Sequence, residues 1–323
     1  MFKILSLLSV LCLTSTIFIS QSESLSTSSL TTDRRSRYDI QLKDSFIRTE
    51  NITQCYPQTL VTKLFSSVPK REKAVDSISL SFGHQHEYND RYTILVGRSA
   101  SGKSTLLRLL ALLERPVSGN LFLNGNEYSF QDNKEGPNAK VFFTDKACKV
   151  PKPIIIDSKP DCYDKKSSIL QHILNSTPEP DWIGAPEIND ADEINELKKS
   201  VVKRFYDIMC LKEDQLYSLK PSDLTPSQQY LFGLVCACMK SSFVNISMNN
   251  NTVEIPSPVL LLDELLDRET SDVANKVGQA LLSLTKTGGV VIAATHRPQY
   301  LTATADRSVT LSSGKVLAVE YHK

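Results

Sequence analysis

The segment 97–105, with the sequence GRSASGKST, limits what this chain can fold into more than any other feature. It matches the phosphate-binding pattern G-x-x-x-x-G-K-[ST]. The β-branched run 91–96 before it predicts a buried strand, and the leucine-rich run 106–114 after it predicts a helix. The pattern requires this context of strand, glycine-rich turn and helix. The sequence therefore predicts a loop whose successive backbone N–H groups bind a polyphosphate.

Glycine, lysine and serine carry the expected chemistry of this loop. The two glycines allow the backbone to bend into one concavity. Lys103 is expected to reach the β- and γ-phosphates and the hydroxyl of Ser104 to bind Mg²⁺, so the predicted cofactors are ATP and Mg²⁺. The predicted nucleotide-binding residues are Gly97, Arg98, Ser99, Ala100, Ser101, Gly102, Lys103, Ser104 and Thr105.

Two apolar runs near the C-terminus predict buried strands that end in polar side chains. The run 259–262 is followed by Asp263 and Glu264, and the run 290–295 is followed by His296. Ligands bind at the carboxyl ends of the strands in an open α/β sheet, so these side chains are expected near the phosphate loop. Asp263 is expected to hold Mg²⁺, directly or through water, and Glu264 to act as a general base on the attacking water. His296 is expected to reach the γ-phosphate and the same water.

Composition excludes several classes of protein. The chain has 323 residues, a net charge of +1 and 23% charged residues, so no basic or acidic excess indicates a nucleic-acid partner or a membrane surface. We therefore expect no nucleic acid. The length allows one large domain or two small ones with a substantial core. The seven cysteines are scattered through a chain longer than a typical disulfide scaffold, which favours free thiols.

The first 37 residues differ from the rest and are expected to form a targeting leader. Lys3 and the apolar run 4–20 fit a signal peptide, and the Ser/Thr-rich stretch 22–37 resembles a transit peptide. ATP is scarce outside the cell, so we favour a bipartite leader that passes through the secretory route into a plastid. The alternatives are a membrane anchor formed by the apolar run, which is marginal in length for a span, and an ordinary secreted protein with an unused nucleotide site.

The alternation of polar and apolar residues and the positions of glycine and proline predict the remaining elements. The segment 83–90, which contains His84 and His86, is expected to be a solvated hairpin turn that leads into the strand before the phosphate loop. The Asn-rich stretch 245–253 is expected to be a loop. Further strands are expected at 38–42, 60–65, 77–82, 120–125, 141–143 and 154–156, and helices at 167–174, 191–209, 226–239 and 272–284.

Taken in order, these segments resemble the nucleotide-binding domain of an ATP-binding cassette (ABC) ATPase, over about residues 77–323. The turn PVSG at 116–119, the stretch 211–229 and the closing segment 303–317 add to the resemblance. It implies an α/β fold for residues 38–323, with a P-loop NTPase core built on a mostly parallel sheet. It also implies an N-terminal antiparallel β subdomain and an inserted helical subdomain at about 158–240.

The sequence departs from the family at its signature, Leu-Ser-Gly-Gly-Gln, which in the family caps the γ-phosphate held by the opposite subunit. Here the corresponding residues are Leu224, Thr225, Pro226, Ser227 and Gln228. Proline removes one N–H donor and serine adds a side chain where the family has glycine. The resemblance therefore implies a weakened composite site.

Three other family features are altered or weakly marked. The glutamine expected after the strand 141–143 is not evident in the residues that follow it. Asp267 is the candidate for the aspartate of the family's dimer-contact loop, but it follows Glu264 about three residues too early. Tyr56 or Phe65 is the candidate for the aromatic residue that stacks on adenine.

The resemblance implies an ABC-type ATPase subunit that binds and hydrolyses Mg-ATP in a nucleotide-sandwich dimer, as a homodimer or as a heterodimer with another ABC domain. Apart from the leader, no long apolar segment is present, so separate membrane permease subunits are the expected transport partners. The alternative is a hydrolysis-deficient ABC-like module that binds ATP and regulates or scaffolds. A small-molecule phosphotransferase is disfavoured, because a lid with several arginines is missing from 158–192.

Overall fold

The structure, a computed structural model, describes most of the chain after residue 38. The described residues are 39–56, 72–83, 90–130, 141–143, 153–156, 167–177, 181–183, 191–205, 211–241, 245–247, 252–264, 266–267 and 269–322. The predicted leader lies outside them and stays a prediction, as do the roles suggested for Phe65, His84 and His86. Residues 144–152, where the family's glutamine was sought, are also outside.

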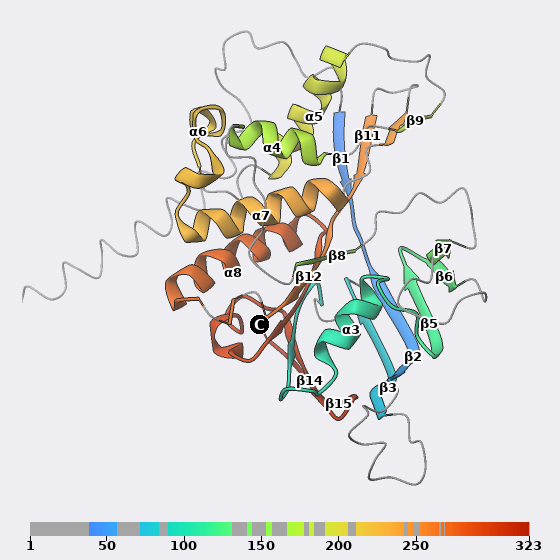
Figure 1. The fold of residues 1–323 in the computed structure, drawn as a ribbon. Coiled ribbons are helices and arrows are strands. Elements are labelled where there is room, and N and C mark those ends of the chain that lie inside the picture. The colour runs from blue at the N-terminus through green and yellow to red at the C-terminus, as the bar shows by residue number, and fades with distance from the viewer. Residues whose placement is uncertain are drawn as a thin grey trace, which may run out of the picture. The chain divides into compact units, whose positions relative to one another are not determined.

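A six-stranded sheet forms the centre of the fold (Figure 1). Five of its strands run parallel, and only β15 is antiparallel to its neighbour β14. This confirms the predicted mostly parallel sheet. The strand order is β15 (Lys315–Tyr321), β14 (Arg307–Ser312), β4 (Tyr92–Val96), β13 (Val290–Thr295), β12 (Val259–Asp263) and β8 (Ile154–Ile156).

Both faces of the central strands are buried, which explains why their sequences are apolar throughout. In β12, Leu260 and Leu262 pack into a core cluster with the helices on one side of the sheet. Leu261 packs into a second cluster on the other side, with Ile292 of β13 and Leu106 of the helix that follows the phosphate loop. Successive side chains of a strand point to opposite faces, so a continuous apolar run satisfies both clusters.

An antiparallel five-stranded sheet contributes to the second cluster and confirms the predicted N-terminal β subdomain. The expected hairpin between β3 and β4 is wrong, because these strands belong to different sheets. The buried strand β4 already pairs with β13 and β14 on its two edges, so β3 pairs with β2 instead. The strand order is β3 (Glu72–Phe82), β2 (Ile47–Tyr56), β5 (Ser118–Leu123), β6 (Asn126–Phe130) and β7 (Val141–Phe143).

The helix α3 (Lys103–Leu110) follows the phosphate loop and ends four residues before the predicted end. Leu112 adopts a left-handed backbone with φ of 60°. The N–H of Leu112 donates to the carbonyl of Leu109, and the N–H of Leu113 donates to that of Arg108, both at 3.0 Å. The left-handed position of this Schellman ending is normally a glycine. Here it is a leucine within a run of leucines, so nothing in the sequence indicated that the helix ends there.

Helices cover the other side of the central sheet and include the predicted helical insertion. In Figure 1, α7 lies between α4 and α8, and α7 also packs against β8 and β12. Among the described helices, none combines the length and the apolar character needed to cross a membrane. The helices are α4 (Ile169–Ser176), α5 (Ala191–Phe205), α6 (Glu213–Ser218), α7 (Pro226–Ser241) and α8 (Ser271–Lys286).

A small four-stranded sheet corrects the expected Asn-rich loop at 245–253, which contains β10 and the start of β11. Val253 and Ile255 of β11 are fully buried and alternate with polar residues, as in a half-buried strand. β11 pairs with its neighbour β10 on one edge and with the parallel strand β1, some two hundred residues away, on the other, and local composition could not reveal this second partner. The order is β1 (Asp39–Lys43), β11 (Thr252–Pro256), β10 (Asn245–Ser247) and β9 (Asp181–Ile183).

Replacing Leu261 by alanine tests the two-sided core. Leu261 is fully buried, so the cavity should lower the free energy of unfolding by about 2–5 kcal/mol. Urea unfolding would measure the loss. In Leu317→Ala the removed side chain is 71% exposed on β15, and a change within about 0.5 kcal/mol is expected. Equal losses in the two variants would contradict the described burial.

Candidate functional site

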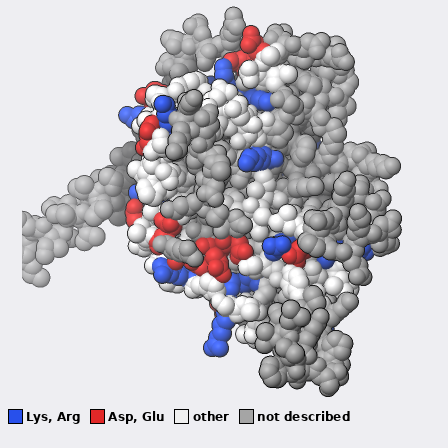
Figure 2. All heavy atoms as spheres, in the orientation of Figure 1, with Lys and Arg blue, Asp and Glu red and all other residues white. Residues whose placement is uncertain are grey.

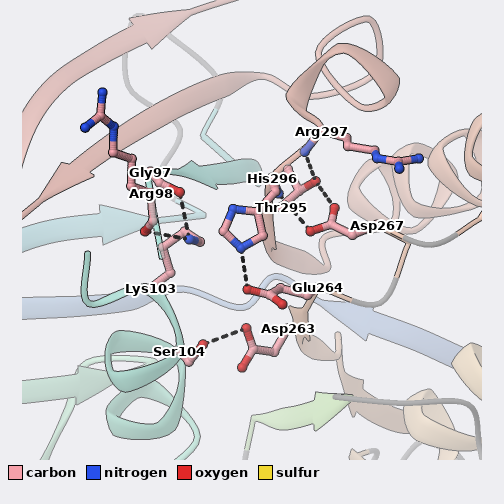
Figure 3. A network of polar contacts seen from close by, with 10 residues as sticks. All are labelled: Gly97, Arg98, Lys103, Ser104, Asp263, Glu264, Asp267, Thr295, His296 and Arg297. Carbon is pink, nitrogen blue, oxygen red and sulfur yellow. Dashed lines mark hydrogen bonds and ion pairs between the residues drawn. The ribbon is translucent and has the colours of Figure 1, made fainter. Parts of the chain in front are cut away.

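The phosphate loop, the two acids and the histidine meet at one end of the central sheet, as the sequence predicts (Figure 3). Parallel pairing brings the carboxyl ends of three strands together. Asp263 of β12 is in register with Ala294 of β13, and Thr295 of β13 is in register with Val96 of β4. The chain enters the phosphate loop directly after Val96.

Backbone geometry explains both glycines of the loop. A Cβ atom at Gly97 would lie 2.5 Å from the carbonyl oxygen of Leu311. Gly102 has φ of 103°, and a Cβ atom there would lie 2.2 Å from the carbonyl oxygen of Ala74. Gly102 is also the N-cap of α3 and has no side chain to cap the helix. The first N–H groups of α3 therefore face the loop concavity, where the positive end of the helix favours an anion.

Lys103 is only 4% exposed and holds its ammonium group inside the loop. Nζ donates to the carbonyl oxygens of Gly97 at 2.8 Å and Arg98 at 3.3 Å. Burial lowers the pKa of Lys103, while the nearby carboxylates of Glu264, Asp263 and Asp267 oppose that shift. A phosphate in the concavity would supply the negative charge that a buried ammonium requires.

Ser104 and Asp263, which the sequence predicts as metal ligands, lie in contact with each other. The Ser104 hydroxyl donates to Oδ1 of Asp263 at 3.0 Å, across 159 residues of sequence. A hydroxyl and a carboxylate are the oxygen ligands that Mg²⁺ prefers beside a substrate phosphate. The buried Ser101 hydroxyl has no hydrogen-bond partner among the described residues. These donors and ligands fit a magnesium-bound polyphosphate.

Glu264 and His296 form a polar pair beside this site. Nε2 of His296 lies 2.7 Å from Oε1 of Glu264. The side chains are 35% exposed for His296 and 47% for Glu264, so water can reach both. Glu264 has a left-handed backbone with φ of 54°, and its N–H donates to the carbonyl of Ala294 at 3.0 Å. A carboxylate paired with an imidazole at an open edge can accept a proton from a bound water.

Asp267 lies within this cluster, a position that sequence reasoning missed. Its carboxylate accepts hydrogen bonds from the Thr295 hydroxyl and from the backbone N–H of His296. The family resemblance implies only that Asp267 lies in a loop that contacts a partner. Ligand atoms of Glu264, Asp267 and His296 all lie within 4.8 Å of one another, so these three side chains could also hold a metal ion.

The signature-like segment 224–228 lies at the start of α7, which Figure 1 places beside α6 and away from α3. Leu224 is buried in the core under the helices. Thr225 and Gln228 form a capping box: Oε1 of Gln228 accepts from the Thr225 backbone N–H at 3.0 Å and from its hydroxyl at 2.9 Å. Pro226 occupies the first helical position, where its missing N–H is tolerated. The helix start is thus largely satisfied by its own residues.

Tyr56 is the only candidate adenine-stacking residue within the described part of the chain. Its hydroxyl donates to the Glu114 carboxylate and also lies within hydrogen-bond reach of Thr105, the last residue of the loop. Burial and the Glu114 carboxylate raise the pKa of Tyr56. The ring therefore stands at the edge of the phosphate loop and remains 37% exposed.

Charges of both signs are distributed over the described part of the face shown in Figure 2, and acidic side chains gather below its centre. This mixed surface is what a net charge of +1 predicts.

A sequence profile of the ABC transporter family matches residues 79–244, slightly more than half of the chain. The macrolide export ATP-binding/permease protein MacB of Campylobacter fetus is 25% identical over 233 residues, which cover 70% of this chain and 29% of that protein. The lipoprotein-releasing system ATP-binding protein LolD of Ehrlichia canis is 39% identical over 80 residues, 21% of this chain and 34% of that protein. The matches therefore span no more than 34% of these two relatives.

Solved structures share the fold. An ATP-binding cassette of an ABC transporter in its ADP conformation has a TM-score of 0.56 and 18% sequence identity, over 87% of this chain and 92% of that chain. A nucleotide-free ATP-binding cassette has a TM-score of 0.53 and 16% identity, over 86% of this chain and 92% of that chain. At this identity the likeness concerns the fold alone.

Gly102→Ala tests the backbone of the phosphate loop. An added Cβ cannot fit against the Ala74 carbonyl, so the variant should lose stability beyond the ~1–2 kcal/mol of a left-handed alanine, and should lose nucleotide binding. Gly125→Ala is the matched control, because its φ is 83° but its nearest Cβ contact is at 3.7 Å. Denaturant unfolding and a fluorescent ATP analogue would compare them. Equal behaviour of both variants would contradict the close approach at Gly102.

Proposed function

This chain belongs to the ABC transporter family, and we propose that it binds and hydrolyses Mg-ATP as the ATPase subunit of a transport system. One observation carries the proposal. The phosphate loop, the Ser104–Asp263 pair and the Glu264–His296 pair meet at the carboxyl ends of three adjacent parallel strands. This arrangement places phosphate donors, candidate metal ligands and a candidate base together.

Binding begins with the loop backbone and Lys103. The N–H groups at the start of α3 hold the phosphates, and the Lys103 ammonium exchanges its bonds to the loop carbonyls for phosphate oxygens. Ser104 and Asp263 would hold Mg²⁺, which neutralises charge on the β- and γ-phosphates when bound. The Tyr56 ring, at the edge of the loop, would stack on the adenine.

Hydrolysis requires a water in line with the γ-phosphorus. Glu264 accepts a proton from that water. The oxygen of the water bonds to the γ-phosphorus as the bond between this phosphorus and the ADP oxygen breaks. His296 keeps the Glu264 carboxylate in place and contacts the γ-phosphate. The exposed fractions of both side chains leave room for the water and the phosphate.

A second cassette would close the site from the other side. The family resemblance supports a nucleotide-sandwich dimer, formed with a second copy or with another ABC domain, that energises separate membrane permease subunits. The capping box at 225–228 uses donors and acceptors that would otherwise face a nucleotide. This observation favours the alternative function, an ATP-binding regulatory or scaffolding module with little turnover.

Glu264→Gln separates binding from hydrolysis. The amide cannot accept the proton, so the ATPase rate constant should fall by about 100-fold or more with ATP affinity retained. Glu269→Gln is the control, because this nearby acid bonds to Tyr230 and lies outside the proposed base pair. Phosphate release would measure turnover.

Lys103→Ala completes the comparison by testing nucleotide binding itself. Loss of the buried ammonium should reduce ATP affinity strongly. Unchanged ATP affinity in Lys103→Ala would contradict nucleotide binding in the loop. A wild-type chain that binds ATP without turnover, indistinguishable from Glu264→Gln, would favour the regulatory module.

The signature-like segment can be tested by restoring glycine. In the Glu264→Gln background, Pro226→Gly combined with Ser227→Gly adds an N–H donor and permits closer backbone approach. ATP-dependent self-association should strengthen roughly tenfold, because a hydrogen bond to a charged group contributes about 1.5–3 kcal/mol. Analytical ultracentrifugation would measure the dimer constant, with Pro221→Gly in the preceding η2 (Pro221–Asp223) as control. Unchanged association would show that this segment does not face nucleotide in a homodimer.

A further inference from the structure

Asp267 connects two segments that carry the proposed catalytic pair. It follows Glu264 by three residues, and its own N–H donates to the Glu264 carbonyl at 3.3 Å. Its side chain reaches the end of β13: Oδ1 accepts from the Thr295 hydroxyl and Oδ2 accepts from the His296 backbone N–H at 2.8 Å. Figure 3 shows both contacts beside the Glu264–His296 pair. Each carboxylate oxygen of Asp267 therefore holds one group at the end of β13.

The contacts extend into a short network around the turn after β13. The oxygen of the Thr295 hydroxyl accepts from the backbone N–H of Arg297 at 2.9 Å while its hydrogen is donated to Asp267. Thr295 is only 3% exposed, so without Asp267 its hydroxyl would be left to find another partner in a buried place. The backbone on both sides of His296 is thus fixed by side chains.

This network lies directly beside the contact that the imidazole of His296 makes. The Glu264 backbone is bonded to Ala294, one strand residue before Thr295, so the two segments are joined at successive positions. With the His296 backbone held by Asp267, the imidazole comes to 2.7 Å from the Glu264 carboxylate. A carboxylate suits this task, because it accepts two hydrogen bonds at once and charge-assisted bonds are the stronger ones.

We propose that Asp267 is a positioning residue, which clamps the end of β13 and so holds His296 against Glu264. The inference rests on the proposed function, because that function gives the Glu264–His296 pair its catalytic role. It goes beyond the proposed function by naming the residue that sets the geometry of the pair. It also adds a role inside its own chain to the expected role of Asp267 as a partner contact, which stays a prediction.

Asp267→Asn is the main test, because it keeps the shape but replaces one acceptor oxygen by a donor group. In the nucleotide-free full-length chain with a chelator present, hydrogen–deuterium exchange of the His296 amide should accelerate roughly tenfold or more. The ATPase kcat should fall by a similar factor, while KM for ATP stays near the wild-type value. Asp267→Glu keeps the carboxylate and should recover part of both. Thr295→Val removes one of the two contacts and should give an intermediate loss.

Asp272→Asn is the matched control. It removes a nearby acidic charge of α8, which pairs only at the surface with Lys276 at 3.0 Å, and should leave both measurements unchanged. Unchanged His296 exchange in Asp267→Asn would overturn the clamp whatever the ATPase rate. A wild-type chain that fails to hydrolyse ATP, but whose His296 exchange still depends on Asp267, would contradict the proposed function and support the clamp.

Discussion

The parallel pairing of β4, β13 and β12 is the constraint on which the rest of the structure depends. It brings together three segments separated by up to two hundred residues of sequence and aligns their carboxyl ends within one register. The phosphate loop follows the first strand, the histidine the second and the acids the third. A slip of one residue would move Asp263 away from Ser104 and turn the apolar side chains of the strand to the opposite face.

Two apolar clusters keep that register. Leu260 and Leu262 fit the helical side, and Leu261 fits the side of α3 and the antiparallel sheet, so each residue of β12 has a required face. The antiparallel sheet also approaches the loop directly, since the Ala74 carbonyl of β3 leaves room only for glycine at 102. The turn between β14 and β15 adds a third support, because Gly314 donates to the Ser101 carbonyl at 3.0 Å. The backbones of β3 and of the β14–β15 turn therefore both lie directly against the loop.

The phosphate loop and the signature-like segment at the start of α7 differ in whether their polar groups already have partners. At the phosphate loop, Gly102 has no capping side chain and Lys103 bonds only to carbonyls that a phosphate can replace. At the start of α7, Thr225 and Gln228 satisfy each other and Pro226 supplies no N–H. The polar groups of the phosphate loop are therefore open to a ligand, whereas those at the start of α7 already have partners within the helix.

The sequence by itself determined the elements whose signals are local. The pattern at 97–105, the apolar runs of β12 and β13 and the polar residues that end them predicted a strand, loop and helix with acids and a histidine close by. Bonding between neighbouring residues and burial on both faces leave a direct mark on such runs. The mostly parallel sheet and the helical insertion were predicted from the family resemblance.

Only the tertiary structure decided the features that depend on distant partners. The strand β11 hides in an Asn-rich stretch because β1 completes its ladder from the other end of the chain. The strand β3 avoids β4 because both edges of β4 are already occupied. Asp267 gives no sign in the sequence that it holds Thr295 and His296, since hydrogen bonds across thirty residues leave no periodic pattern. All strands and helices compete for the same sheet edges and faces, and this competition sets which distant segments pair and pack. A short stretch of sequence contains no information about it.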